Sequence, residues 1–337
     1  MWYSLARSAL FRLDPEVAHD LALKSLAALG PGASLFGTGT SRAETRHMMG
    51  LEFANPVGVA AGLDKNGEYL DALAALGFGF LEIGTVTPRP QPGNPRPRMF
   101  RLVEHQAIIN RLGFNNDGVE RLVANVARSR YRGVLGINIG KNFDTPIERA
   151  ADDYVACLEA VYASASYVTV NVSSPNTANL RDLQSPALLG ELLSAIMAKR
   201  EALASRHGSR KPIALKIAPD LDEAGIEAVA RLALEHRIEA LIATNTTISR
   251  EMVAASPLAA EAGGLSGRPL FRRSTDVLAK LAAALGGRVP LIGVGGILSG
   301  ADARAKIDAG ATLVQMYTGF IYRGPSLVAE ARRALSS

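Results

Sequence analysis

The chain contains 337 residues, 48% of them hydrophobic and 20% charged, which predicts a sizeable buried core and excludes a largely disordered protein. A formal net charge of +5 favours anionic ligands. Basic residues do not alternate with aromatic ones as nucleic-acid binding requires, so no nucleic-acid partner is expected. Cys157 is the only cysteine, which excludes an intrachain disulfide and cysteine-based metal centres, and no metal site is expected.

The first 45 residues predict two short helices and a linker. Asp14-Pro15-Glu16 restarts a helical pattern with a capping aspartate and a proline at the first helical position. Gly30-Pro31-Gly32 ends this second helix, and small residues from Gly32 to Ser41 predict a linker. We therefore divide the chain into an N-terminal helical domain, residues 1–45, and a main domain, residues 46–337.

The N-terminal helices have two interpretations. They can pack on the main domain as an ordinary helical pair. Alternatively, they present a surface that lies in the lipid interface, because Trp2, Tyr3 and Phe11 accompany Arg7 and Arg12. No apolar run in the chain reaches the roughly 18 residues that a membrane span requires.

From Asn55 onward, eight apolar runs rich in β-branched residues alternate with segments of helical period. They are Val57–Ala60, Phe80–Ile83, Val134–Ile137, Tyr167–Val170, Ile213–Ile217, Ala240–Ala243, Leu291–Val294 and Leu313–Met316. Their number and alternation predict an α/β fold, an eight-stranded parallel (β/α)8 TIM barrel. A doubly wound sheet is the alternative, because alternation alone does not show that the sheet closes.

The segment between the second and third strands departs from this alternation. Its proline-rich part, Pro88–Pro97, predicts an excursion over the barrel mouth. Between Arg89 and Arg111 there are five arginines against the single acid Glu104, which predicts a basic patch beside the site or, equally well, a solvated face. The arginines are Arg89, Arg96, Arg98, Arg101 and Arg111.

Polar or glycine residues follow every predicted strand. Because the carboxyl ends of barrel strands meet at one rim, these residues should converge on one site. They are Ala61–Asn66, Gly84–Thr85, Asn138 with Lys141, Asn171–Thr177, Lys216, Thr244–Thr246, Gly295–Gly296 and Tyr317–Gly319.

Glycines after the last two strands predict a phosphate site. Backbone N–H groups can approach an anion closely in Gly293–Ile297 and after Tyr317, and barrels often bind phosphate at these two loops. Lys65 and Lys216 stand at strand ends, where each could face an anionic ligand such as a flavin ring or form a salt bridge across the barrel mouth. Asp64 could be a partner in such a bridge.

Ser174 has two interpretations that the residues leave open. The chain has no G-x-S-x-G motif and no triad-like arrangement of histidines, which disfavours acyl transfer. The hydroxyl can instead remove a proton from a carbon acid if nearby amides stabilise charge and Thr177 serves as a relay. Alternatively, Ser173 and Ser174 only form hydrogen bonds with the loop backbone.

Six long motifs, spread over nearly the whole chain, resemble those of one enzyme family. They are AAGLDKNGE at Ala60, GTVTPRPQPGNPRPRMFRL at Gly84, NRLGFNNDG at Asn110, NVSSPNT at Asn171, GGLSGRPL at Gly263 and GVGGI at Gly293. In these segments the chain resembles the class 2, quinone-dependent dihydroorotate dehydrogenases. One departure is Ala178-Asn179, where many members of that family have Pro-Gly.

The resemblance implies a flavoenzyme of pyrimidine (UMP) biosynthesis that oxidises (S)-dihydroorotate to orotate with FMN and passes the electrons to a membrane quinone. It implies that Ser174 is the catalytic base for the C5 proton. The implied FMN contacts are Ala61, Gly62, Leu63, Asp64, Lys65, Thr85, Asn138, Asn171, Lys216, Thr244, Gly267, Gly296, Tyr317 and Thr318. The implied substrate contacts are Lys65, Asn110, Arg111, Leu112, Gly113, Phe114, Asn171, Asn176, Asn245 and Thr246.

The N-terminal helices resemble the quinone-entry domain of the same family, with His19, Arg101 and Tyr317 at the quinone site. The resemblance thus implies a peripheral protein on the cytoplasmic side of the inner membrane, in contact with lipid and expected to be a monomer. An RNA-modifying flavin barrel and a noncatalytic phosphate-binding barrel are the competing hypotheses. The first lacks the support of a cysteine in a predicted active loop, and the second predicts a colourless protein.

Overall fold

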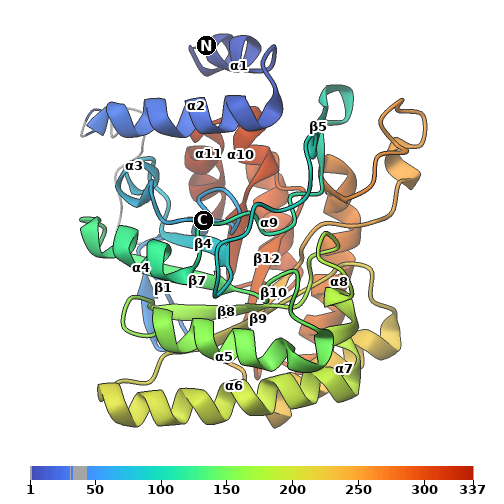
Figure 1. The fold of residues 1–337 in the computed structure, drawn as a ribbon. Helices are drawn as coiled ribbons and strands as arrows, with labels where there is room; N and C mark the ends of the chain where they lie inside the picture. Colours follow the sequence, from blue (N-terminus) through green and yellow to red (C-terminus); the bar gives the residue numbers. More distant parts are fainter. Residues whose placement is uncertain (1, 31, 33–43, 337) are drawn as a thin grey trace.

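The computed structural model describes residues 2–30, 32 and 44–336. Eight parallel strands close into a barrel, and all eight strands predicted from the sequence are confirmed (Figure 1). In order around the barrel they are β3 (Val57–Val59), β4 (Phe80–Val86), β7 (Val134–Ile139), β8 (Tyr167–Asn171), β9 (Ile213–Ile217), β10 (Ala240–Ala243), β12 (Leu291–Val294) and β13 (Leu313–Met316). The closure excludes the doubly wound alternative.

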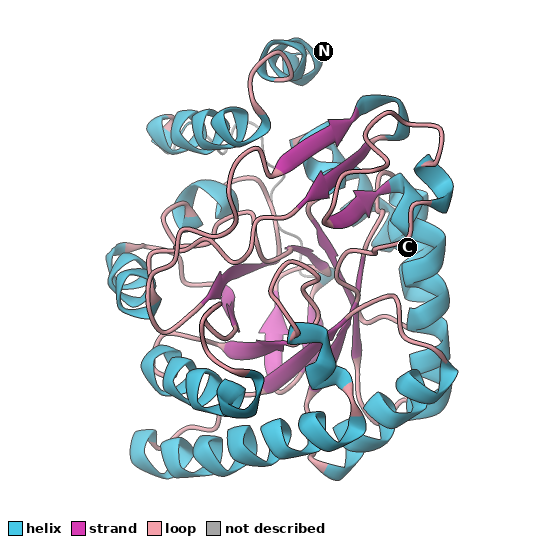
Figure 2. Cartoon of the chain, turned by 45° about the vertical axis from the view of Figure 1, so that its right-hand side comes forward, coloured by secondary structure: helices cyan, strands magenta, loops and turns pink. Residues whose placement is uncertain are grey.

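Helices surround the barrel, as expected for strands that are buried on both faces (Figure 2). They are α3 (Leu70–Ala74), α4 (Val119–Arg128), α5 (Ala150–Val161), α6 (Pro186–His207), α7 (Glu223–Glu235), α8 (Phe271–Leu285), α9 (Gly300–Asp308), α10 (Thr318–Arg323) and α11 (Pro325–Leu335). Side-chain caps fix several helix starts. The Asp222 carboxylate accepts from Gly225 N–H at α7, and Ser299 Oγ accepts from Asp302 N–H at α9.

The two predicted N-terminal helices are confirmed as α1 (Trp2–Leu10) and α2 (Pro15–Ala28). As expected, Asp14 caps α2, because its carboxylate accepts from the N–H groups of Glu16 and Val17. Both helices lie outside the ring of strands, next to the loops at one end of the barrel (Figure 1). The predicted linker falls on residues 33–41, which lie outside the described part of the chain, and the division at residue 45 stays a prediction.

The opposite end of the barrel is covered by a hairpin of β1 (Arg46–Met48) and β2 (Leu51–Phe53). The Phe53 ring packs edge-on against Phe80 with ring centroids 5.1 Å apart, and both side chains are fully buried. This aromatic pair belongs to a cluster that also holds Tyr167 and Leu313 from the barrel strands. The amino-terminal end of the barrel is therefore packed core, and the open end is the carboxyl-terminal one.

A three-stranded antiparallel sheet projects from the barrel and was not predicted from the sequence. It consists of β5 (Met99–Leu102), β6 (Ala107–Asn110) and β11 (Gly264–Gly267), in the order β11-β6-β5. The proline-rich segment leads directly into β5, which confirms an excursion between the second and third barrel strands. Figure 1 shows β5 extending toward the N-terminal helices. This sheet and the helices therefore lie on the same end of the barrel.

Candidate active site

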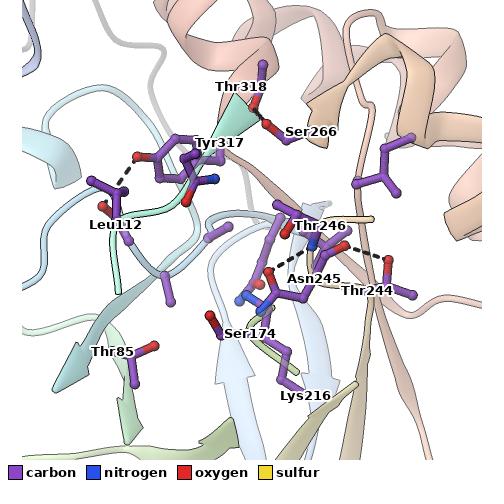
Figure 3. Close-up of a pocket in the computed structure, with 18 of the residues that line it drawn as sticks. Thr85, Leu112, Ser174, Lys216, Thr244, Asn245, Thr246, Ser266, Tyr317 and Thr318 are labelled. Carbon is purple, nitrogen blue, oxygen red and sulfur yellow. Dashed lines mark hydrogen bonds between the residues drawn. The ribbon is translucent and has the colours of Figure 1, made fainter. Parts of the chain in front are cut away.

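A cavity of about 980 Å³, including space open to solvent, lies at the carboxyl ends of the barrel strands (Figure 3). Residues on or after β3, β4, β8, β9, β10, β12 and β13 line it, together with the projecting sheet. The predicted residues in the lining are Ser174, Ala61, Gly62, Lys65, Thr85, Asn171, Lys216, Thr244, Gly267, Gly296, Tyr317, Thr318, Asn110, Leu112, Gly113, Phe114, Asn176, Asn245 and Thr246. Convergence of the strand ends on one site is thereby confirmed.

Four predicted contacts do not reach this lining. Leu63 belongs to the hydrophobic core, and the Asp64 carboxylate accepts from the N–H groups of Glu68 and Tyr69 just before α3. Asn138 lies one layer deeper in the barrel, where its Oδ1 accepts from Thr85 Oγ1 at 2.6 Å. Arg111 is turned away and forms an ion pair with Glu261, with Nη1 and Oε2 2.6 Å apart. Their assignment as ligand contacts stays a prediction.

Asparagine side chains form a connected set of hydrogen bonds around the cavity. Asn171 Nδ2 donates to Thr85 Oγ1 at 2.9 Å, and Asn176 Nδ2 donates to Asn110 Oδ1 at 3.1 Å. Asn176 Oδ1 is buried and has no hydrogen-bond partner within the described residues. A buried acceptor without a donor is costly, so this oxygen fits an N–H group of a bound molecule.

Ser174 is 5% exposed and points into the cavity beside Lys216 (Figure 3). Its Oγ accepts from the N–H of Asn176 at 3.2 Å, which would stabilise negative charge that develops on the oxygen. Ser173 Oγ behaves differently, because it donates to Asn171 Oδ1 at 2.7 Å within the loop. Thr177 Oγ1 is buried with no partner among the described residues, so a proton relay from Ser174 to Thr177 requires a bridging water.

Neither strand-end lysine forms an ion pair within the described part of the chain, so the alternative of a salt bridge across the barrel mouth is wrong. Lys65 Nζ donates to Asn115 Oδ1 at 2.5 Å, and burial, with a smaller contribution from Arg98, lowers the pKa of Lys65 to about 8. Burial also lowers the pKa of Lys216, an effect that the Glu82 carboxylate opposes. Two amines therefore face the cavity and are available to an anionic ligand.

The loop after β12 passes close behind the cavity and tolerates only glycine. A Cβ on Gly296, whose φ is +75°, would lie 2.5 Å from Phe271 Cα, and one on Gly295 would lie 2.7 Å from Ser274 Oγ. Gly295, Gly296 and Gly319 all line the cavity. Backbone N–H groups at such positions can contact an anion directly, as the sequence predicted.

Comparison with known proteins identifies this arrangement. A family model described as dihydroorotate dehydrogenase matches residues 44–337. The chain belongs to the dihydroorotate dehydrogenase family. It is 61% identical over 335 residues to the dihydroorotate dehydrogenase (quinone) of Burkholderia multivorans, with 99% of this chain and 97% of the relative covered. It is 60% identical over 340 residues to that of Methylococcus capsulatus, covering 100% and 99% of the two chains.

Solved structures agree with the sequence comparison. DHODH from Eimeria tenella in complex with ferulenol superimposes with a TM-score of 0.87 at 37% identity, covering 97% of this chain and 93% of that one. The ligand-free form of that DHODH also gives 0.87, at 39% identity and coverages of 96% and 94%. The predicted barrel and the predicted membership of the quinone-type dihydroorotate dehydrogenases are confirmed, and with them the assignment as an oxidoreductase.

A further, mainly apolar pocket of about 620 Å³, including space open to solvent, lies between α1, α2 and the barrel of this dihydroorotate dehydrogenase homologue. His19 and Arg101 line it, whereas Tyr317 lines the main cavity and shares with His19 an adjacent pocket beside Lys65. Burial, followed by the charge of Lys65, lowers the pKa of His19. The Arg101 guanidinium donates to the carbonyls of Leu10 and Leu13 at the end of α1, which gives it a structural role beside any contact with a ligand.

The arginines of the predicted basic patch are engaged within the protein. Arg98 and Arg96 both form ion pairs with Glu16 at the start of α2, and the Arg98 side chain is only 7% exposed. Arg89 forms an exposed pair with Asp144. The Arg96 and Arg98 pairs attach α2 to the proline-rich segment. The Arg89 and Arg96 side chains stay 61% and 66% exposed, as the solvated-face alternative expects, whereas Arg98 is buried in its ion pair.

Sequence reasoning missed two polar residues inside the barrel. Glu82 on β4 is fully buried and accepts from Gln315 Nε2 at 2.8 Å, while Gln315 Oε1, which has no partner in the described residues, belongs to a residue of the cavity lining. The available signal was a single polar residue within each apolar strand, Phe-Leu-Glu-Ile and Leu-Val-Gln-Met.

No helix of the described residues is long and apolar enough to cross a membrane.

Proposed function

We propose that this member of the family oxidises (S)-dihydroorotate to orotate with FMN bound in the main cavity and with a membrane quinone as the electron acceptor, as a step of pyrimidine biosynthesis. The observation that carries the proposal is the convergence, in one cavity, of an almost fully buried Ser174, the amine of Lys216, several asparagine amides and the glycine loop after β12. Such a set suits a flat polar ring, a phosphate group and the transfer of one proton.

The residues of the cavity fit FMN. The amine of Lys216 and the Gln315 Oε1 atom lack protein partners among the described residues and can contact the polar edge of a flavin ring. Gly295 and Gly296 supply backbone where any Cβ would clash, which suits the phosphate. The proposed contacts are those predicted residues that line the cavity: Ala61, Gly62, Lys65, Thr85, Asn171, Lys216, Thr244, Gly267, Gly296, Tyr317 and Thr318.

In the reaction that we propose, FMN, when bound, supplies the acceptor for the hydride that leaves C6 of dihydroorotate. Ser174 Oγ would take up the C5 proton while its own hydroxyl proton leaves through a bridging water toward Thr177 Oγ1, and the Asn176 N–H at 3.2 Å would stabilise the negative charge on this oxygen as that proton leaves. Asn110, Asn176 and Asn245 bind the ring edge of the substrate, whose donors and acceptors match carboxamides. The protonated amine of Lys65 is placed to bind its carboxylate.

Substitution of the proposed base tests this mechanism. In Ser174→Ala, FMN should be retained, while bleaching of the flavin absorbance by dihydroorotate under anaerobic conditions slows by at least about 10²-fold at neutral pH. The control is Ser194→Ala on α6, whose hydroxyl is exposed and donates to the Gly190 carbonyl away from the cavity. Bleaching at the wild-type rate in Ser174→Ala would remove Ser174 from the role of base, and a colourless wild-type protein would overturn the whole proposal.

For the second half of the reaction we propose the apolar pocket beneath α1 and α2 as the quinone site, with His19 and Arg101 near the quinone carbonyls and Tyr317 between the pocket and the flavin. Exposed leucine and valine side chains on these helices support a lipid-facing surface: Leu5, Leu13, Val17, Leu21 and Leu29. We further propose a peripheral monomer on the cytoplasmic side of the inner membrane. Reduction of a long-chain quinone by detergent-purified protein tests this assignment.

A further inference from the structure

Lys306 is a buried charge that the proposed reaction does not use. It lies on α9 and is fully buried. Its Nζ donates to Ser274 Oγ at 2.6 Å and lies 5.1 Å from the centre of the Phe271 ring. It forms no ion pair within the described residues, although an ammonium group removed from water normally requires an anionic partner.

Lys306 and Ser274 stand directly behind the glycine loop of the main cavity. Ser274 Oγ is 3.1 Å from the carbonyl oxygen of Gly295, and a Cβ on Gly293 would lie 3.0 Å from Lys306 Cβ. One face of this loop thus contacts the lysine and the serine, and the other face, at Gly295 and Gly296, lines the cavity. An anion bound on the cavity side of the loop could therefore serve as the anionic partner that Lys306 lacks within the described residues.

We propose that Lys306, acting through Ser274 and the Gly295 backbone, is a positioning residue that makes the site select a flavin with a phosphate over one without. The inference rests on the proposed binding of FMN in this cavity. Ser274 Oγ accepts from Nζ, and its single proton faces three carbonyl oxygens, those of Leu270 at 2.9 Å, Phe271 at 3.0 Å and Gly295 at 3.1 Å. In the proposed arrangement this proton goes to Gly295, which holds the loop with its N–H groups toward the cavity. The positive charge behind the loop then offsets the negative charge in front of it.

Burial lowers the pKa of Lys306 to about 7, against an opposing effect of Asp302 on α9 and Asp276 on α8. A phosphate on the far side of the loop favours the charged amine and raises this pKa. Below about pH 7 the lysine is protonated with and without ligand, whereas above it FMN binding must take up a proton. Apart from the second ionisation of the phosphate near pH 6, the preference for FMN over riboflavin should therefore not change up to about pH 7 and should then fall by up to about tenfold per pH unit.

The test starts from the holoenzyme and measures the displacement of FMN by added riboflavin, read as the released FMN at pH 5.5 to 9. The ratio of the two affinities is insensitive to a general loosening of the flavin pocket. In Lys306→Met, which keeps the length of the side chain, the preference for FMN at pH 6.5 should drop at least about tenfold and lose its decline above pH 7. The matched control is Lys280→Met on α8, whose amine forms an exposed pair with Glu223.

The second ionisation of the FMN phosphate, near pH 6, changes the preference for FMN in the wild type and in Lys306→Met alike. Comparison of the two proteins therefore separates this effect from the titration of Lys306. A wild-type preference that does not change between pH 7 and 9, or a Lys306→Met preference within twofold of wild type, would overturn the inference. If Lys306→Met retains no flavin of either kind, the wild-type pH profile alone decides. If the wild-type protein carries no FMN, the proposed function fails instead, which is a distinguishable outcome.

Discussion

The ion pair between Glu16 and Arg98 is a nearly buried link between the N-terminal helices and the rest of the molecule. Both carboxylate oxygens of Glu16 accept from Arg98 Nε, at 3.1 and 3.0 Å, and Oε1 also accepts from Nη2 at 2.9 Å. The two side chains are 12% and 7% exposed, so solvent screens the pair little. We therefore expect Glu16→Gln to loosen α2 without disturbing the barrel.

The magnitude follows from the chemistry of the pair. An amide keeps the shape of the carboxylate and one acceptor, but it loses the charge and the second charge-assisted bond, which are together worth about 2 kcal/mol. Loss of an acid from the first turn of α2 adds a few tenths of a kcal/mol at most. The free energy of local opening of α2 should thus fall by about 2 kcal/mol, which increases the opened population roughly 30-fold.

Amide hydrogen exchange of α2 measures this population directly. Exchange should accelerate roughly 30-fold in α2 and stay unchanged in β8 and β9, while dihydroorotate still bleaches the flavin and quinone reduction slows. The control Glu223→Gln removes an exposed pair with Lys280 that is worth at most about 1 kcal/mol and should leave α2 unaffected. Exchange in α2 within twofold of wild type would show that other contacts hold the helices, and the reasoning would be wrong.

Three further predictions concern Lys65, Gly296 and Asn179. The pKa of Lys65 is lowered to about 8, so the affinity for orotate should not change with pH below about 8 and should fall up to about tenfold per pH unit above it. Binding titrations at several pH values should find no such pH dependence in Lys65→Met. Gly296→Ala should cost about 1–3 kcal/mol and release FMN, whereas Gly286→Ala, at φ +56° with open space around it, should keep the flavin. Asn179 has φ +56°, so thermal unfolding should show Asn179→Gly within about 1 kcal/mol of wild type and Asn179→Val clearly destabilised.

The barrel was predictable because each of its strands is a local, nearly continuous apolar run, as in Val168-Thr169-Val170, and because the count of eight permits closure. The projecting sheet was not. Gly264 pairs with Asn110 and Gly267 with Ala107, so its strands meet across about 150 residues of chain. Ala107–Ile109 is apolar but too short to stand out from the loop around it, and Gly264–Gly267 is not apolar. Pairing between distant segments also leaves no periodic signal in either one.

The site was located by the strand-end rule, yet the roles of charged residues near it were harder to assign. Arg98 and Arg111 follow the same proline-rich segment and look alike in sequence, but they bind Glu16 and Glu261, acids that are distant along the chain. A run of like charges does not reveal whether its partners lie within the protein or in a ligand. Lys216 was recognisable because a lysine inside an apolar strand needs an anion that the strand itself lacks.

The orientation of the loop that carries Ser174 depends on Glu82, a residue that sequence reasoning did not single out. Asn138 Nδ2 donates to Glu82 Oε1 at 2.9 Å, which leaves its Oδ1 to accept from Asn171 Nδ2 at 3.1 Å. Asn171 Oδ1 must then face the loop, where it accepts from both N–H and Oγ of Ser173. A carboxylate cannot donate a hydrogen bond, so Glu82 fixes the orientation of the Asn138 side-chain amide. Asn138 in turn fixes the orientation of Asn171, which bonds to Ser173, the residue before Ser174. Glu82 thereby positions Ser174 indirectly, through Asn138 and Asn171. This role is a physical reason for an acidic residue inside the otherwise apolar strand β4.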